Sequence, residues 1–140
     1  MNDLIQFAQG HLLLSVAWLV VAVLLAYAQL RHMASAPQAV SPQTLTNLVN
    51  RENGVVIDIR AQADYNKGHI HGAINIPLSK VKDSIKDLEK YQDTPIIMVC
   101  ANGISVAAAC STLKKSGMQQ VHKLSGGMGS WVGDNLPLVK

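Results

Sequence analysis

The chain has 140 residues, of which 49% are hydrophobic and 15% charged, with 12 basic and 9 acidic residues. This length is enough for one domain and an accessory segment. The charges of both signs are interspersed and no basic stripe carries interleaved aromatic residues, so the sequence gives no support to a nucleic-acid partner. The chain has two cysteines, Cys100 and Cys110, which argues against a disulfide framework and fits a reducing compartment.

Residues 12–30, LLLSVAWLVVAVLLAYAQL, carry no charge and predict one long apolar helix. At 1.5 Å per residue this helix is about 28 Å long, close to the bilayer hydrocarbon core of about 30 Å. A buried core helix would be unusual with every face apolar. A cleaved signal peptide is the other alternative, but residues 1–11 contain no lysine or arginine and the apolar stretch is too long for one. We expect residues 1–31 to form a retained transmembrane anchor.

Basic residues flank the predicted anchor on one side only. Arg31 follows the apolar stretch, whereas no lysine or arginine precedes it. By the positive-inside rule this asymmetry predicts a single-pass protein of a bacterial-type inner membrane, with its N-terminus outside and its C-terminal domain in the cytoplasm. The anchor is compatible with a membrane-protein partner, but no residue identifies one.

The elements expected after the anchor alternate between helices and strands. Residues 32–40 are small and polar with one proline, which is typical of a linker, and the domain is expected to cover residues 41–140. Ser41 and Pro42 indicate a helix start, and Gly54 its end. Strands are predicted at 55–59, 73–76, 95–99 and 121–124, helices at 80–91 and 105–116, and a short last helix near Trp131, which packs against the sheet. This alternation predicts an α/β fold, a parallel sheet with helices on both faces.

Cys100 lies between the strand predicted at 95–99 and the helix predicted at 105–116. Parallel sheets bind ligands beyond the carboxyl ends of their strands, so this position suits a reactive residue. The amides of residues 101–105 and the following helix N-terminus can converge on the sulfur and favour its thiolate. Gly103 allows a loop conformation that a side chain forbids. The alternative is an inert core cysteine.

Three motifs, in order along the chain, resemble those of the rhodanese family. Residues 55–77, VVIDIRAQADYNKGHIHGAINIP, resemble its N-terminal signature, and residues 124–137, LSGGMGSWVGDNLP, resemble its C-terminal signature. Between them, residues 100–105, CANGIS, lie where that family carries its active-site loop. The resemblance covers about Ser41 to Leu138 and implies a rhodanese-like fold.

The resemblance also implies a sulfurtransferase without metal or organic cofactor. Cys100 would take a sulfane sulfur from a donor as a persulfide and pass it to a thiol or another nucleophile, with Arg60 near the same site. The residues expected to contact the substrate are Arg60 and the loop residues Ala101, Asn102, Gly103, Ile104 and Ser105, and Asp58 and His69 are expected to support the site.

The predicted loop differs from that of thiosulfate-using members, which often carry basic residues there. Ala101, Asn102, Ile104 and Ser105 have no charge, so an anionic donor would lose charge-assisted hydrogen bonds. We therefore expect poor turnover of thiosulfate and keep a second hypothesis open, a catalytically weak rhodanese-like adaptor at the membrane. Phosphatases of the C-x5-R type are excluded because Val106 occupies the arginine position.

Other polar and sulfur-bearing residues have structural alternatives. Arg60 and Asp58 could form an ion pair that braces neighbouring loops, and His69 could hydrogen-bond the backbone in a buried turn. Cys110 is expected to be a core residue. His71 and His122 have no partners at ligand spacing, so no metal site is predicted.

Overall fold

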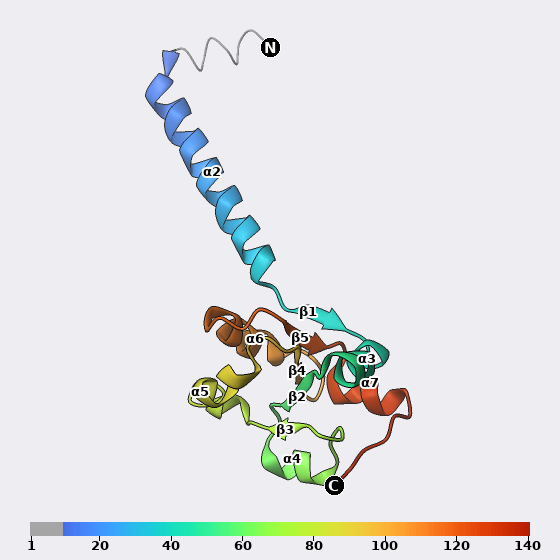
Figure 1. Cartoon of the computed structure of the whole chain (residues 1–140). Helices are drawn as coiled ribbons and strands as arrows, with labels where there is room; N and C mark the ends of the chain where they lie inside the picture. The colour runs from blue at the N-terminus through green and yellow to red at the C-terminus, as the bar shows by residue number, and fades with distance from the viewer. Residues whose placement is uncertain (1–9) are drawn as a thin grey trace. The chain divides into compact units, whose positions relative to one another are not determined.

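The computed structural model describes residues 10–140. The chain divides into two compact units, residues 1–36 and 37–140. The first contains helix α2, Leu12–Ser35 (Figure 1). Within it, Leu12–Leu30 has a mean hydropathy of 2.2 and no buried residue, so its length and composition suit a membrane span. The flank upstream of the helix, on which the predicted orientation depends, includes residues 1–9, which lie outside the described residues.

The second unit is built on a parallel five-stranded sheet in the order β1-β5-β4-β2-β3. The strands are β1 (Gln38–Val40), β2 (Val55–Asp58), β3 (Ile74–Asn75), β4 (Ile96–Val99) and β5 (Val121–Leu124). The parallel sheet of the predicted α/β architecture is therefore confirmed. Strand β4 is central, and its residues Ile96, Ile97, Met98 and Val99 are fully buried. Such a strand is apolar throughout because helices cover both faces of the sheet.

Two helical layers cover the sheet (Figure 1). The helices of the domain are α3 (Pro42–Glu52), α4 (Gln62–Lys67), α5 (Ile85–Leu88), α6 (Val106–Lys115) and α7 (Gly127–Gly133). Ile96 and Met98 of β4 belong to a core that includes residues of α5 and α6. Ile97 and Val99 belong to a second core that includes residues of α3 and α7, among them Trp131. Alternate residues of one strand thus build the two cores, as the period of two requires.

Helix α3 begins as predicted and ends one residue earlier than expected. The Ser41 hydroxyl accepts a hydrogen bond from the Thr44 amide at 3.2 Å, and Pro42 occupies the first turn. The helix ends at Glu52 and is capped by Asn53, whose backbone is left-handed (φ 53°) and whose amide bonds the Leu48 carbonyl. Asparagine tolerates this conformation better than most residues, so it replaces the expected glycine cap.

Two segments differ from the prediction. The linker expected at 32–40 is shorter, because α2 runs to Ser35 and Gln38–Val40 forms an edge strand paired with β5. The prediction of a continuous helix at 80–91 is wrong. The short helix α5 lies between two 3₁₀ turns, Leu78–Lys80 and Glu89–Tyr91. A helix of this length depends on tertiary packing, and only Val81 and Leu88 are buried along it.

Candidate active site

Cys100 follows β4 directly and lies at the carboxyl end of the central strand, as predicted. The residue is 4% exposed and packs in the core that includes Val106 of α6. It is therefore placed where parallel sheets bind ligands, but it is well shielded from solvent. Residues 101–105 connect it to the N-terminus of α6.

The Cys100 sulfur accepts a hydrogen bond from one backbone amide. The Gly103 N–H donates to Sγ at 2.9 Å, and Gly103 adopts the left-handed φ of +80° that its missing side chain permits. Among the residues that the structure describes, no other amide donates to this sulfur. The Ile104 amide instead bonds Asn102 Oδ1 at 3.2 Å, and the Cys100 thiol donates weakly to the same oxygen at 3.9 Å. The expected convergence of five amides on the sulfur is thus reduced to the Gly103 amide.

The remaining loop side chains face solvent. Ala101, Asn102, Ile104 and Ser105 are exposed, and Ile104 is 76% exposed. Ser105 precedes α6 without making a side-chain cap hydrogen bond. The loop that surrounds the sulfur is therefore accessible to a partner and carries no charged side chain.

The first turn of α7, which sequence reasoning did not connect with Cys100, contacts the backbone of the Cys100 loop. The Met128 amide donates to the Cys100 carbonyl at 2.8 Å, and the Gly129 amide donates to the Ala101 carbonyl at 3.1 Å. Gly127 has a φ of +58°, and a Cβ there would clash with the Cys100 carbonyl oxygen. Gly127, the first residue of α7, therefore allows the backbone of this helix to approach the loop.

Asp58 and Arg60 form a partly buried ion pair. Arg60 Nη2 lies 2.6 Å from Asp58 Oδ2 and also donates to the Gly68 carbonyl at 2.8 Å. The Arg60 backbone amide and Nε both donate to Asp58 Oδ1 at 3.0 Å. The Arg60 side chain is 13% exposed and the Asp58 side chain is 2% exposed. These contacts fit the bracing alternative, and substrate binding by Arg60 stays a prediction.

Replacing Arg60 with lysine should reveal this bracing role. Arg60→Lys keeps one positive charge beside Asp58 but loses the planar fork that contacts Asp58 and Gly68 together. We expect the free energy of unfolding to fall by about 1–3 kcal/mol, measured by urea denaturation in detergent micelles. Lys67→Ala, in the exposed pair with Asp64, is the control and should change stability little. An unchanged Arg60→Lys protein would contradict the bracing role.

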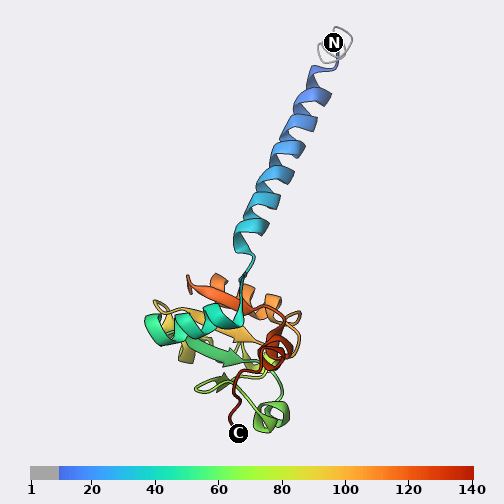
Figure 2. The ribbon, with the colours of Figure 1, turned by 90° about the vertical axis from the view of Figure 1, so that its right-hand side faces the viewer.

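His69 has the structural role that sequence analysis offered as its alternative. Its ring stacks on Tyr65 with centroids 3.7 Å apart, and Nδ1 lies 3.0 Å from the Tyr65 carbonyl oxygen. Its backbone pairs in both directions with Val139. Figures 1 and 2 both show the C-terminal end beside α4. His69 thus fixes the C-terminal segment against α4.

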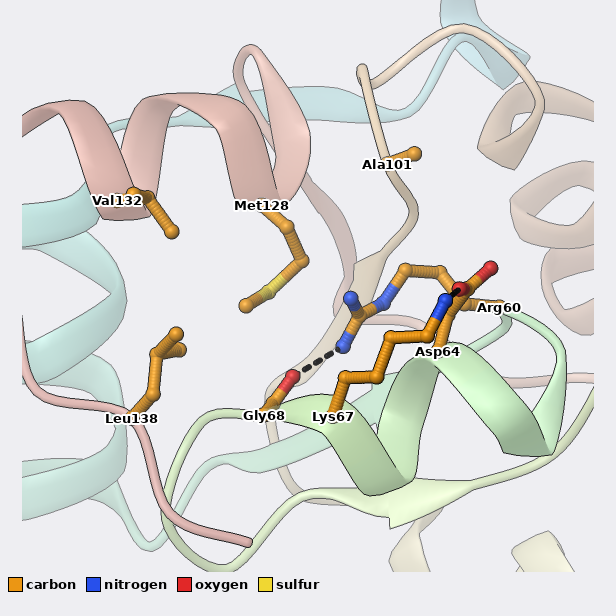
Figure 3. Close-up of a pocket in the computed structure, with 8 residues that line it drawn as sticks. All are labelled: Arg60, Asp64, Lys67, Gly68, Ala101, Met128, Val132 and Leu138. Atoms are coloured by element: carbon orange, nitrogen blue, oxygen red, sulfur yellow. Dashed lines mark hydrogen bonds and ion pairs between the residues drawn. The ribbon is translucent and has the colours of Figure 1, made fainter.

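A cavity of about 390 Å³ adjoins the Cys100 loop. Figure 3 shows that its walls come from α4, α7, the loop after β4 and the C-terminal segment. The residues that line it are Arg60, Asp64, Lys67, Gly68, Ala101, Met128, Val132 and Leu138. The Lys67 ammonium donates a hydrogen bond to Asp64 and lowers the pKa of that carboxyl group. Sequence analysis missed this cavity because its walls are far apart along the chain.

Cys110 is a core residue, which confirms the prediction. It is fully buried in α6, and its thiol lies 3.7 Å from the His122 carbonyl oxygen. Burial raises the pKa of Cys110 to about 12. Burial also lowers the pKa of His122, which favours the neutral imidazole. Within residues 10–140, no group of three or more His, Cys, Asp and Glu side chains is arranged to hold a metal ion.

The two cysteines should therefore react differently with an alkylating reagent. At pH 8, below its raised pKa, Cys110 stays a protonated and buried thiol, so we expect iodoacetamide to modify Cys100 alone in the folded chain. In urea both cysteines should react. Peptide mass spectrometry identifies the modified residue, and rapid alkylation of Cys110 in the folded chain would contradict its assignment to the core.

Comparison with known proteins places this site in a family. Residues 41–134 match the family profile described as the rhodanese-like domain. The chain belongs to the rhodanese-like domain family. The match includes the N-terminal signature, the Cys100 loop and residues 124–134 of the C-terminal signature, so it covers strands β2 to β5 and the helices around the cavity.

Similar proteins include sulfurtransferases. The chain is 36% identical to the uncharacterized protein YibN of Escherichia coli, over 100% of this chain and 99% of that protein. It is also 36% identical to the thiosulfate sulfurtransferase GlpE of Pseudoalteromonas translucida, over 64% of this chain and 82% of that protein. A crystal structure of a rhodanese-related protein from Thermoplasma volcanium has a TM-score of 0.66 at 28% identity, covering 73% of this chain and 97% of its own.

Proposed function

We propose that this chain is a membrane-tethered sulfurtransferase that carries a persulfide on Cys100 and passes the sulfane sulfur to a thiol. The observation that carries the proposal is the Cys100 sulfur at the end of β4, with the Gly103 amide 2.9 Å away. An N–H donor and a helix N-terminus stabilise negative charge on sulfur. Similarity to a thiosulfate sulfurtransferase supports the same chemistry.

The proposed cycle has two balanced steps. The Cys100 thiolate attacks the outer sulfur of a persulfide donor, whose sulfur–sulfur bond breaks, so the donor leaves as a thiolate and Cys100 becomes a persulfide. An acceptor thiolate then attacks the outer sulfur of Cys100, and the acceptor leaves as a persulfide while the Cys100 thiolate returns. Neither step needs a net oxidant or a cofactor.

Thiosulfate is proposed to be a poor donor. Residues 101–105 carry no charge, and the cations beside the loop, Arg60 and Lys67, are paired with Asp58 and Asp64. Thiosulfate, a dianion, would therefore meet no unpaired cation among these residues. Two missing charge-assisted hydrogen bonds, at about 1.5–3 kcal/mol each, correspond to about a hundred-fold or more in rate.

A comparison of donors tests this proposal. The full chain in detergent micelles is incubated with a small persulfide or with thiosulfate, and its intact mass is followed over time. We expect the mass of one sulfur atom to be gained with the persulfide, and about a hundred-fold more slowly with thiosulfate. Failure to gain sulfur from either donor would contradict the sulfurtransferase and favour the second candidate, a binding module that uses its exposed loop, in which Ile104 is 76% exposed.

The membrane tether and its orientation are part of the proposal. The apolar stretch Leu12–Leu30 supports a span, and Arg31, as the nearest basic residue, favours a cytoplasmic domain at a bacterial-type inner membrane. Fusing alkaline phosphatase or a fluorescent protein to the C-terminus in bacteria tests the orientation. We expect fluorescence and no phosphatase activity, whereas the reverse result would place the domain outside.

A further inference from the structure

The walls of the cavity beside the Cys100 loop are largely apolar. Ala101, Met128, Val132 and Leu138 contribute them, and Val132 and Leu138 are 51% and 43% exposed. A ligand would therefore cover apolar surface that water now contacts, which favours binding. The volume of about 390 Å³ lies at the small end of ligand sites, which measure about 300–1,000 Å³.

The charges of the cavity favour an uncharged occupant. Arg60 is paired with Asp58 at 2.6 Å, and Lys67 with Asp64 at 2.9 Å. Each cation thus has its counter-charge within the protein. An anionic ligand would lose its hydration without gaining an unpaired cation, which is unfavourable.

Arg60 still offers hydrogen-bond donors to such an occupant. Its Nε and Nη2 contact Asp58, and Nη2 also contacts the Gly68 carbonyl. Within the part of the chain that the structure describes, no acceptor is bonded to Nη1. Figure 3 shows the guanidinium beside Met128 and Gly68, with a dashed line to the Gly68 carbonyl oxygen. A neutral carbonyl oxygen is an acceptor suited to this donor.

The cavity and the nucleophile share one stretch of backbone. Ala101 lines the cavity, and the Met128 amide bonds the Cys100 carbonyl at 2.8 Å. Any molecule held in the cavity therefore lies beside the residue next to Cys100. Cys100 itself does not line the cavity, so the thiol of an occupant must extend past Ala101 to reach the sulfur.

We propose that this cavity holds the body of the sulfur acceptor, and that the acceptor is a peptide cysteine flanked by an apolar residue. The apolar side chain fills the cavity, and a peptide carbonyl oxygen accepts a hydrogen bond from Arg60 Nη1. The inference rests on the proposed function and adds the class of acceptor. The peptide thiolate attacks the outer sulfur of the Cys100 persulfide, the sulfur–sulfur bond breaks, and the peptide leaves as a persulfide.

The test uses three peptide acceptors that differ in one side chain. The full chain in detergent micelles is loaded with sulfur, freed of donor and mixed with the amide of N-acetyl-Cys-Leu, N-acetyl-Cys-Gly or N-acetyl-Cys-Asp. Because leucine buries apolar surface, we expect its acceptor to take sulfur about ten-fold faster than the glycine acceptor, and the aspartate acceptor to be no faster than glycine. Equal rates for all three acceptors would overturn the inference.

Two variants assign the preference to the cavity. Val132→Asp places a charge on its wall and should abolish the leucine preference. Leu78→Asp is the matched control, because Leu78 is 44% exposed and does not line the cavity. This control should keep the preference. A leucine preference that survives Val132→Asp would overturn the assignment.

A binding measurement separates the acceptor site from sulfur chemistry. The amide of N-acetyl-Ser-Leu cannot accept sulfur, and its binding to the unloaded full chain is followed by the chemical shifts of the Met128 and Val132 amides. We expect saturable shifts that Val132→Asp removes. If the chain takes up sulfur from a persulfide donor but these chemical-shift changes are absent, the cavity assignment alone is overturned. If the chemical shifts change but the chain takes up no sulfur, the cavity is supported as a binding site and only the proposed sulfurtransferase is contradicted.

Discussion

The Cys100→Ser chain is expected to gain no sulfur from a persulfide donor under conditions that load the natural chain completely. A serine hydroxyl stays protonated at neutral pH, and within residues 10–140 no base is hydrogen-bonded to this position, so it cannot attack the donor. Cys110 remains in this variant, but burial raises the pKa of its thiol to about 12. Intact-mass spectrometry of both chains, side by side, makes the measurement.

The matched control removes the other cysteine. Cys110→Ala deletes the thiol within the α6 core and should leave the extent of sulfur loading unchanged, although the smaller side chain lowers stability. If Cys100→Ser still gained sulfur, or if Cys110→Ala lost the ability, the sulfur would be carried on a different residue from the one proposed.

Gly127→Ala is expected to damage both the fold and sulfur loading. At a φ of +58° an alanine is strained, and its Cβ would clash with the Cys100 carbonyl oxygen and lie 2.8 Å from the Gly103 nitrogen. That nitrogen donates the hydrogen bond to the Cys100 sulfur. We expect the free energy of unfolding to fall by about 3–5 kcal/mol and the loading rate of the remaining folded protein to fall as well.

Gly133→Ala, at the other end of α7, is the control for this substitution. Its Cβ would meet nothing within 4 Å, so the change should alter stability by less than about 1 kcal/mol and leave loading intact. Urea denaturation and the mass assay compare the two variants. Equal behaviour of Gly127→Ala and Gly133→Ala would show that the close approach of α7 to the loop is not needed.

Much of the fold could be predicted because each buried central strand appears in the sequence as one short, mostly apolar run. The runs at 55–59 and 95–99 are apolar on both faces, and the structure places them as the neighbouring central strands β2 and β4. The edge strand Gln38–Val40 could not be predicted, since only Val40 is buried and its pairing with β5 is distant in sequence. The segment 80–91 has helical charge patterning but too little buried surface to form one helix.

The position of Cys100 was predictable, and the arrangement around it was less so. A cysteine between an apolar strand and a helix is visible in the sequence, as is the glycine that bends the loop. The direction in which each loop amide points is not visible in the sequence. The Asn102 side chain, for example, accepts the hydrogen bond from the Ile104 amide. The support from Met128 and the apolar cavity depend on tertiary contacts between α7, α4 and the C-terminal segment, which no local pattern encodes.

Following one labelled sulfur atom through Cys100 tests the central claim most directly. The full chain is loaded from a persulfide whose outer sulfur carries an isotope label, freed of donor, digested in part for mass spectrometry and otherwise mixed with an excess thiol. We predict that the label first resides on the peptide containing Cys100 and then appears in the persulfide of the added thiol, at equal amounts. A label that never enters this peptide, or that stays there when the thiol is added, would contradict sulfur transfer by this protein.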